Sequence, residues 1–222
     1  MKILIISKDN IWTKKLINKL SNLKYNFIYS PICDKNFIDN IKPNWVFFFH
    51  WSDFVSKEIY KIYKCAVIHT GNLPKGRGGS PIQNQILEGI NNTKVNIIEM
   101  TDPMDSGGVY CSESITLQGN LTDIWLSIAE TSYKLIKYCV INNPTPTPQK
   151  GKSQVYKRIK NNEIEFDKSK NISYLYDQIR MVDDNSYPNP YFDINGYRLE
   201  FSRAKLENNQ IITDVKIKRR QP

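Results

Sequence analysis

The sequence has little of what metal and disulfide sites are built from. It contains two histidines and four cysteines in 222 residues, and no two cysteines form a C-x-x-C pair. Clustered cysteine and histidine ligands are typical of structural zinc sites. We therefore expect no bound metal. Cys65 and Cys111 lie in strand-like surroundings and are expected to pack as small apolar side chains.

The chain also lacks a long hydrophobic run. No stretch of about 18 consecutive apolar residues occurs, so we expect no membrane span. The apolar run at the N-terminus, residues 1–7, is too short for a secretory signal and is typical of a first strand. These absences favour a cytoplasmic protein.

The net charge of +9 has more than one explanation. Basic proteins bind nucleic acids, anionic membrane surfaces or small molecules that carry phosphate. The abundance of lysine, asparagine and isoleucine is also typical of an AT-rich genome. No block of lysine and arginine recurs with interleaved aromatic residues, so we expect no nucleic-acid partner. The basic segment Lys216–Arg220 is expected to be a solvated end.

The order of the predicted elements indicates the fold class. Strand-like and helical segments alternate repeatedly, which favours an α/β fold with a doubly wound, mostly parallel sheet. The predicted strands are residues 2–7, 26–29, 45–49, 65–68, 95–100 and 108–115. The predicted helices are residues 12–20, 34–41, 55–63, 81–90 and about 121–141.

A proline-rich stretch, Pro144–Pro148, predicts a domain boundary. Such a segment is stiff and extended, and it makes a natural link out of a core domain. We expect a catalytic domain at residues 1–148 and a small C-terminal subdomain at residues 149–222. The elements predicted for the subdomain are a helix at 171–181, strands at 191–194, 197–203 and 211–218, and a hairpin turn at Asn195-Gly196.

The most informative segment is residues 69–85. It follows the predicted strand 65–68, places His69 at the strand end, and continues through a glycine-rich loop to a helix that begins at Ser80-Pro81. Ligands of open α/β sheets bind at the carboxyl ends of the strands. His69 is therefore a candidate for chemistry, and the alternative is a structural histidine that caps the strand.

A second candidate lies on a later loop. Asp105 precedes Ser106-Gly107-Gly108, between two predicted strands. A histidine and a carboxylate brought together at strand ends suit proton transfer near neutral pH. The alternative is that Asp105 bonds to the backbone of its own turn. The loop at 76–79 lacks the G-x-G-x-x-G spacing of dinucleotide folds, so a nicotinamide site is not favoured.

Together these segments resemble the formyltransferase family that uses 10-formyltetrahydrofolate. The family includes methionyl-tRNA formyltransferase, glycinamide ribonucleotide formyltransferase and sugar N-formyltransferases. Its pattern is Asn-x-His, then Leu-Pro, Arg-Gly and Pro-Ile-Gln, and later Asp-x-Gly. The matching residues here are His69, Leu73-Pro74, Arg77-Gly78, Pro81-Ile82-Gln83 and Asp105-Ser106-Gly107. The resemblance is weaker over residues 1 to about 204, and the last part looks like the variant of bacterial surface-sugar (lipopolysaccharide) pathways.

The resemblance implies a Rossmann-like core with a small C-terminal α+β appendage. It also implies transfer of a formyl group from 10-formyltetrahydrofolate to the primary amine of an amino sugar that is linked to a nucleotide. His69 would polarise the formyl carbonyl, and Asp105 would orient His69 and take the amine proton. A homodimer is expected from the same resemblance.

Two alternatives stay open. One is methionyl-tRNA formylation; the larger C-terminal domain of that enzyme would need about 80 to 100 residues more, so we expect that domain to be absent. The other is a folate- or nucleotide-binding protein without turnover. Val67 keeps this second alternative open, because it stands where the family has the asparagine that helps to hold the oxyanion. Asn72, His50 or a backbone N–H of the loop would have to replace that asparagine.

The resemblance assigns further roles. The residues expected to hold the folate are Phe49, His50, Trp51, Phe54, Met100, Asp102 and Met104. Those expected to contact the acceptor are Arg77, Gly78, Asn84, Arg180 and Tyr187. The alternatives are that the aromatic residues cover the end of the core and that each arginine pairs with a structural carboxylate.

Overall fold

The computed structural model describes residues 1–160, 164–167 and 169–220. Contacts divide the chain into two compact units that interleave in the sequence. The first unit comprises Met1–Gly78, Thr93–Ile115 and Trp125–Val155, and the second comprises Gly79–Asn92, Thr116–Ile124 and the chain from Tyr156 onward. This division differs from a single boundary at residue 148. The stretch Pro144–Pro148 belongs to the first unit because Thr147 and Val109 exchange backbone hydrogen bonds there.

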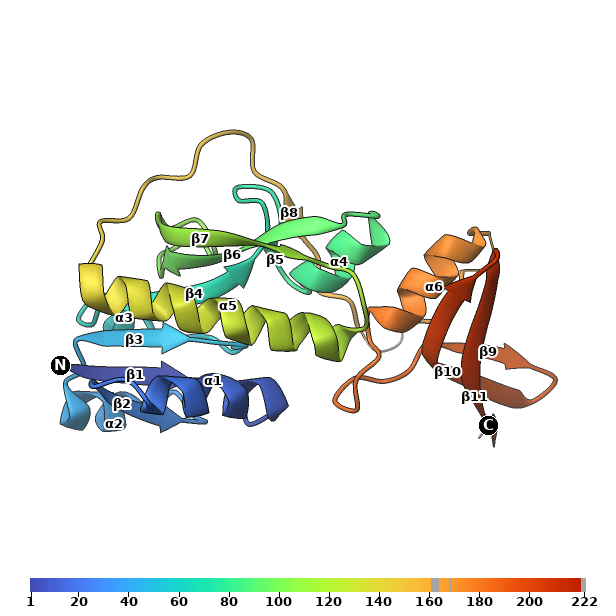
Figure 1. The fold of residues 1–222 in the computed structure, drawn as a ribbon, viewed down its shortest axis with the longest axis horizontal. Helices are drawn as coiled ribbons and strands as arrows, with labels where there is room; N and C mark the ends of the chain where they lie inside the picture. The colour runs from blue at the N-terminus through green and yellow to red at the C-terminus, as the bar shows by residue number, and fades with distance from the viewer. Residues whose placement is uncertain (161–163, 168, 221–222) are drawn as a thin grey trace. The chain divides into compact units, whose positions relative to one another are not determined.

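A six-stranded sheet forms the centre of the first unit (Figure 1). Its strands, in spatial order, are β2 (Asn26–Ser30), β1 (Lys2–Ile6), β3 (Trp45–Phe48), β4 (Cys65–Thr70), β6 (Asn92–Glu99) and β7 (Val109–Thr116). The first four strands pair in parallel, and β6 pairs with β4 in antiparallel orientation. The prediction of a mostly parallel α/β sheet is confirmed.

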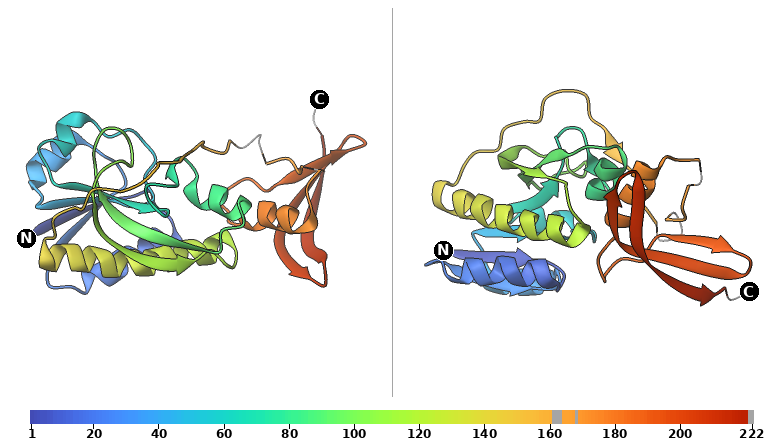
Figure 2. Two further views of the ribbon diagram at one scale, coloured as in Figure 1. Left: turned by 90° about the horizontal axis from the view of Figure 1, so that it is seen from above. Right: turned by 45° about the vertical axis from the view of Figure 1, so that its right-hand side comes forward.

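Helices cover both faces of this sheet, which explains why β1 and β3 are continuous apolar runs. In the first unit, α1 (Ile11–Ser21) and α5 (Leu121–Asn142) lie on one face, and α2 (Lys35–Ile41) and α3 (Lys57–Tyr60) on the other (Figures 1 and 2). Trp12 of α1 stacks on Trp125 of α5 with ring centroids 5.5 Å apart.

The helix starts follow ordinary capping rules, with one exception. Asn10 and Asp34 accept hydrogen bonds from backbone N–H groups in the first turns of α1 and α2. Ser80, which precedes α4 (Pro81–Leu87), was expected to cap that helix in the same way. It does not, because its φ is 47° and its hydroxyl oxygen accepts from the backbone N–H of Ile159 instead.

The second unit contains α4, α6 (Ile172–Arg180) and a small antiparallel sheet. The strand order of that sheet is β11 (Gln210–Arg219), β10 (Tyr197–Glu207), β9 (Tyr191–Ile194). Asn195 and Gly196 connect β9 to β10 with φ values of 47° and 78°, as a type I′ hairpin turn requires. The predicted helix, strands and hairpin of the C-terminal part are confirmed. Two short strands, β5 (Arg77–Gly78) and β8 (Val155–Tyr156), complete the assignment.

Candidate functional site

His69 lies inside β4 and not beyond its end. The strand continues to Thr70, and His69 pairs with Asn96 of β6. The side chain is buried, with 6% of the residue exposed. The Nε2 atom is 2.8 Å from the carbonyl oxygen of Gly76. Because a carbonyl oxygen only accepts, Nε2 carries a hydrogen and donates it.

Asp105 is the residue that faces the other ring nitrogen. Its Oδ2 atom lies 3.5 Å from Nδ1 of His69, and the two side chains are 8% and 7% exposed. The same Oδ2 atom accepts a hydrogen bond of 2.9 Å from the backbone N–H of Gly78. Oxygen atoms therefore face both nitrogens of the imidazole.

The two residues converge by a route that the sequence did not indicate. Glu99, at the end of β6, pairs with Ala66 near the start of β4, because β4 and β6 run in opposite directions. The loop that follows β6 therefore starts beside the beginning of β4 and folds back to place Asp105 at His69. The expectation that both residues sit at carboxyl ends of parallel strands was wrong, although the expected pair is present.

Backbone geometry fixes this loop. Asp105 has a φ of 56°, in the left-handed region that a non-glycine residue rarely adopts. A Cβ atom on Gly107 would lie 2.0 Å from the carbonyl oxygen of Glu99. Only glycine fits at this position, and this close approach accounts for the Gly107 of the Asp-x-Gly motif.

Two side chains, Arg77 and Gln149, hold the Asp105 loop in place through hydrogen bonds. Arg77 donates to Oε1 of Gln149 from Nε at 3.0 Å and from a terminal nitrogen at 2.7 Å. The amide nitrogen of Gln149 donates to the carbonyl oxygens of Asp105 and Gly107. Arg77 thus pairs with the side-chain amide of Gln149. We did not predict a role for Gln149.

Replacements for the family asparagine are few. Val67 is two residues before His69 in β4, so both side chains lie on the same face of the strand. His50 makes edge contacts with Trp125 and Trp12, and its Nδ1 is 3.2 Å from the Asn10 amide. Asn72 is exposed.

The backbone N–H groups of the glycine loop are already used. Gly76 and Arg77 donate to Gln154, Gly78 donates to Asp105, and Lys75 donates to Asn72. Because these four N–H groups already donate within the protein, they are not available to an oxyanion. The exposed side chain of Asn72 is the candidate donor of this loop.

The residues expected to hold a folate fall into two groups. Phe54 and Met104 are 84% and 73% exposed, an unusual state for large apolar side chains. Asp102 forms an ion pair with Lys57, and this hydrogen bond raises the pKa of Lys57. The ion pair connects the start of α3 to the loop that carries Met104.

The other expected folate residues belong to the core. Phe49 is fully buried and meets Trp125 edge to face, so its side chain is not available to a ligand and that assignment was wrong. Met100 and Trp51 are partly buried against the core beneath α2 and α3. The buried Nε1 of Trp51 finds no hydrogen-bond partner among the described residues.

Three expected acceptor residues belong to the second unit. The amide nitrogen of Asn84 donates to the backbone oxygens of Gly79, Ser80 and Lys157, so Asn84 is a structural residue and the expected acceptor contact is not supported. Tyr187 lines a small cavity of about 30 Å³.

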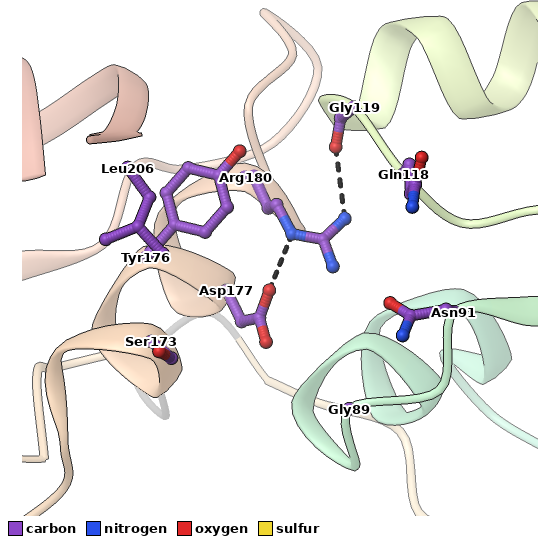
Figure 3. A pocket seen from close by; sticks show the side chains of 9 residues that line it. All are labelled: Gly89, Asn91, Gln118, Gly119, Ser173, Tyr176, Asp177, Arg180 and Leu206. Atoms are coloured by element: carbon purple, nitrogen blue, oxygen red, sulfur yellow. Dashed lines mark hydrogen bonds and ion pairs between the residues drawn. The ribbon is translucent and has the colours of Figure 1, made fainter. Parts of the chain in front are cut away.

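Arg180 lines a larger cavity of about 380 Å³ within the second unit (Figure 3). Its guanidinium pairs with Asp177 and donates to the backbone oxygens of Leu117 and Gly119. The alternative that Arg180 pairs with a local acid is therefore realised, while its place in the cavity wall also leaves it near any ligand bound there.

Within the described ranges, no cluster of three or more His, Cys, Asp or Glu side chains is placed to hold a metal ion. Among the helices that the structure describes, none has both the length and the apolar character needed to cross a membrane.

Comparison with known proteins places the chain among formyltransferases. Residues 160–218 match the family described as "Methionyl-tRNA formyltransferase, C-terminal domain". The chain is 28% identical over 202 residues to methionyl-tRNA formyltransferase of Clostridioides difficile, covering 85% of this chain and 65% of that protein. It spans about half to two thirds of the length of the first curated relatives that it matches. The match at 160–218 counts against our expectation that the C-terminal domain of that enzyme is absent.

Solved structures share the fold. A structure titled methionyl-tRNA formyltransferase from Clostridium thermocellum superposes with a TM-score of 0.91 at 33% identity, over 99% of this chain and 100% of that one. Aquifex aeolicus HypX, solved with tetrahydrofolic acid, gives 0.82 at 18% identity, over 93% of this chain and 38% of that one. A 4-N formyltransferase from Francisella tularensis gives 0.70 at 19% identity, over 91% of this chain and 97% of that one.

Proposed function

Because the chain belongs to the formyltransferase family, we propose that it transfers the formyl group of 10-formyltetrahydrofolate to a primary amine, with His69 and Asp105 at the reacting atoms. The observation that carries this proposal is the buried contact between Nδ1 of His69 and Oδ2 of Asp105 at 3.5 Å. In the reaction, the amine attacks the formyl carbon, and negative charge develops on the formyl oxygen.

His69 is the donor proposed for that oxygen. Its Nε2–H is now directed at the carbonyl oxygen of Gly76, so the formyl oxygen would have to share or replace this acceptor. A donor that strengthens its hydrogen bond as charge develops stabilises the transition state more than the ground state. Burial of the ring adds to this effect, since hydrogen bonds are electrostatically stronger away from water.

Asp105 is proposed to hold the imidazole and to accept the proton that the amine loses, directly or through one water. Its carboxylate is buried and is oriented by the N–H of Gly78.

The residues present fit a folate. Exposed Phe54 and Met104 offer apolar contact to a flat heterocycle. The loops that carry Phe54 and Met104 are held by the ion pair of Lys57 with Asp102. Pterin binding between them is supported by the fold shared with HypX, which was solved with tetrahydrofolic acid.

For the acceptor we propose a nucleotide-linked amino sugar. The proposal is supported by the fold that this chain shares with the 4-N formyltransferase of Francisella tularensis. The excess of positive charge would also suit an acceptor that carries phosphate. The homodimer stays a prediction, which light scattering tests.

Methionyl-tRNA is the second candidate acceptor. The curated relatives are named for it, as is the Clostridium thermocellum structure that this chain covers completely. These names conflict with our expectation of no nucleic-acid partner. The basic composition is compatible with either acceptor, so the distinction requires an experiment.

The experiment offers both acceptors to the same preparation. The protein is incubated with 10-formyltetrahydrofolate and either a panel of nucleotide-linked 3-amino and 4-amino sugars or methionyl-tRNA. Mass spectrometry then looks for the gain of one CO unit, with the Asp105→Asn variant as control. Formylation of a sugar alone supports the sugar acceptor, and formylation of methionyl-tRNA alone replaces it. Tetrahydrofolate binding with no product in either arm would leave a binding protein without turnover.

A further inference from the structure

Two cysteines of the first unit touch each other. Cys111 lies on β7 and Cys139 on α5, and their sulfur atoms are 3.5 Å apart. All four cysteines are free thiols in this structure. Cys139 is fully buried, while Cys111 is partly exposed, so a small reagent can reach one member of the pair. Their contact joins β7 to α5, the helix that follows it in the chain (Figure 1).

We propose that Cys111 and Cys139 are a modification site at which a hydroperoxide forms a reversible disulfide. A disulfide needs the two sulfur atoms about 2.05 Å apart, so they must approach by roughly 1.5 Å from their present contact.

The chemistry balances in two steps. The thiolate of Cys111 attacks one oxygen of hydrogen peroxide, which gives a sulfenic acid and, with the thiol proton, one water. The thiol of Cys139 then attacks the sulfenic sulfur, the S–S bond forms, and a second water leaves. Both sulfurs are oxidised by one electron each, and the peroxide is reduced by two. A dithiol reductant reverses the change by thiol–disulfide exchange.

Cys111 is the better nucleophile of the pair. The hydrogen bond with Cys139 lowers the pKa of the Cys111 thiol and raises that of Cys139. When Cys111 is oxidised, this cause of the raised pKa of Cys139 is removed. The other cysteines differ, since burial raises the pKa of Cys65 to about 12 and raises that of Cys33 as well. Cys111, which is also the partly exposed member of the pair, is therefore the thiol at which oxidation begins.

The crosslink would join the two segments that hold the Asp105 loop. β7 begins at Val109, directly after that loop, and the chain after α5 leads to Gln149, whose amide holds Asp105 and Gly107. Val109 and Thr147 also pair through their backbones. If the proposed function holds, displacement of these segments lowers the rate of formyl transfer in the oxidised protein.

The test uses the full chain and counts thiols. Titration with hydrogen peroxide should remove two hydrogens and two titratable thiols per chain, and peptide mapping should find Cys111 joined to Cys139. Dithiothreitol should restore both thiols. Cys111→Ser and Cys139→Ser should each abolish the crosslink, while Cys33→Ser, a matched control outside the pair, should form it normally. Circular dichroism checks that each variant is folded.

Two results would overturn the proposal. One is a wild-type protein whose Cys111 proceeds to sulfinic acid while Cys139 stays a free thiol. The other is a crosslink that maps to a different pair of cysteines. Neither readout depends on formyl transfer, so a failure of the proposed function would leave this test intact. Oxidation can also be followed through the rate of formyl transfer. A rate that falls after oxidation and recovers with dithiothreitol, in wild type and Cys33→Ser but in neither pair variant, would connect the site to activity.

Discussion

Arg77 holds the side-chain oxygen of Gln149 with two N–H groups, at 3.0 and 2.7 Å. This contact fixes the amide of Gln149 so that its nitrogen donates to the backbone on both sides of Ser106. Arg77, which the family resemblance assigns to the acceptor site, therefore contacts the Asp105 loop through Gln149. It positions the loop that carries Asp105.

Replacement of Gln149 by leucine should release that loop. We expect kcat to fall by roughly 100-fold, since small displacements of a reacting group cost about this much, while KM for the acceptor changes little. The melting temperature should also fall, because each lost hydrogen bond contributes about 1 kcal/mol. Steady-state kinetics and thermal unfolding check both effects. Gln210→Leu, at an exposed glutamine of the second unit, is the control and should leave kcat unchanged.

Val67→Asn should raise the rate of formyl transfer. The side chain of residue 67 lies on the same face of β4 as His69, and an amide there would add a donor for the oxyanion. Because removal of one such donor costs roughly 100- to 1000-fold, its restoration should produce a gain of that order at most. Val67→Leu is the apolar control. Single-turnover kinetics measure the change, and a slower Val67→Asn enzyme would mean that another group already supplies the donor.

Phe54→Ala and Met104→Ala should each raise KM for 10-formyltetrahydrofolate. Both side chains are mostly exposed, so neither substitution should change the melting temperature by more than a degree or two, as surface changes rarely exceed about 0.5 kcal/mol. Ile62→Ala, at another exposed apolar residue, is the matched control and should leave KM unaltered. Unchanged KM values in both test variants would move the folate site elsewhere.

Gly107→Ala should destabilise the protein strongly. Its Cβ would lie 2.0 Å from the carbonyl oxygen of Glu99, so the backbone must move, and we expect a loss of roughly 3 kcal/mol or more. Gly89→Ala is the comparison. Gly89 has a φ of 72° but open space around it, so its substitution should cost only about 1 kcal/mol. Urea unfolding measures both free energies, and equal losses would contradict the close packing at Gly107.

Much of the fold follows from the sequence because the elements of the first unit are strongly patterned. The run at β3 is apolar at every position, and the strands and hairpin after residue 190 carry clear turn signals. The direction of β6 was not predictable in this way. Its run of buried residues at Val95–Ile98 would suit a parallel or an antiparallel pair equally, so only the structure shows that the Asp105 loop folds back.

The sequence motif predicted which side chains belong to the site. It did not predict the hydrogen-bond partners of those side chains. His69 and Asp105 are brought together as expected, but the partner of Arg77 lies 72 residues further along the chain. Serine is a common N-cap residue, but Ser80 does not cap α4. Its hydroxyl oxygen instead accepts a hydrogen bond from the backbone N–H of Ile159. Such distant partners leave no signal in local sequence.

A double-mutant cycle at His69 and Asp105 separates a working pair from two independent residues. His69→Ala and Asp105→Asn should each reduce kcat for formyl transfer by roughly 100- to 10,000-fold, and circular dichroism should show both variants folded. If the two residues act through their buried contact, the double variant should be about as slow as the slower single variant. Losses that multiply in the double variant, or a single variant with wild-type kcat, would contradict their joint action in catalysis.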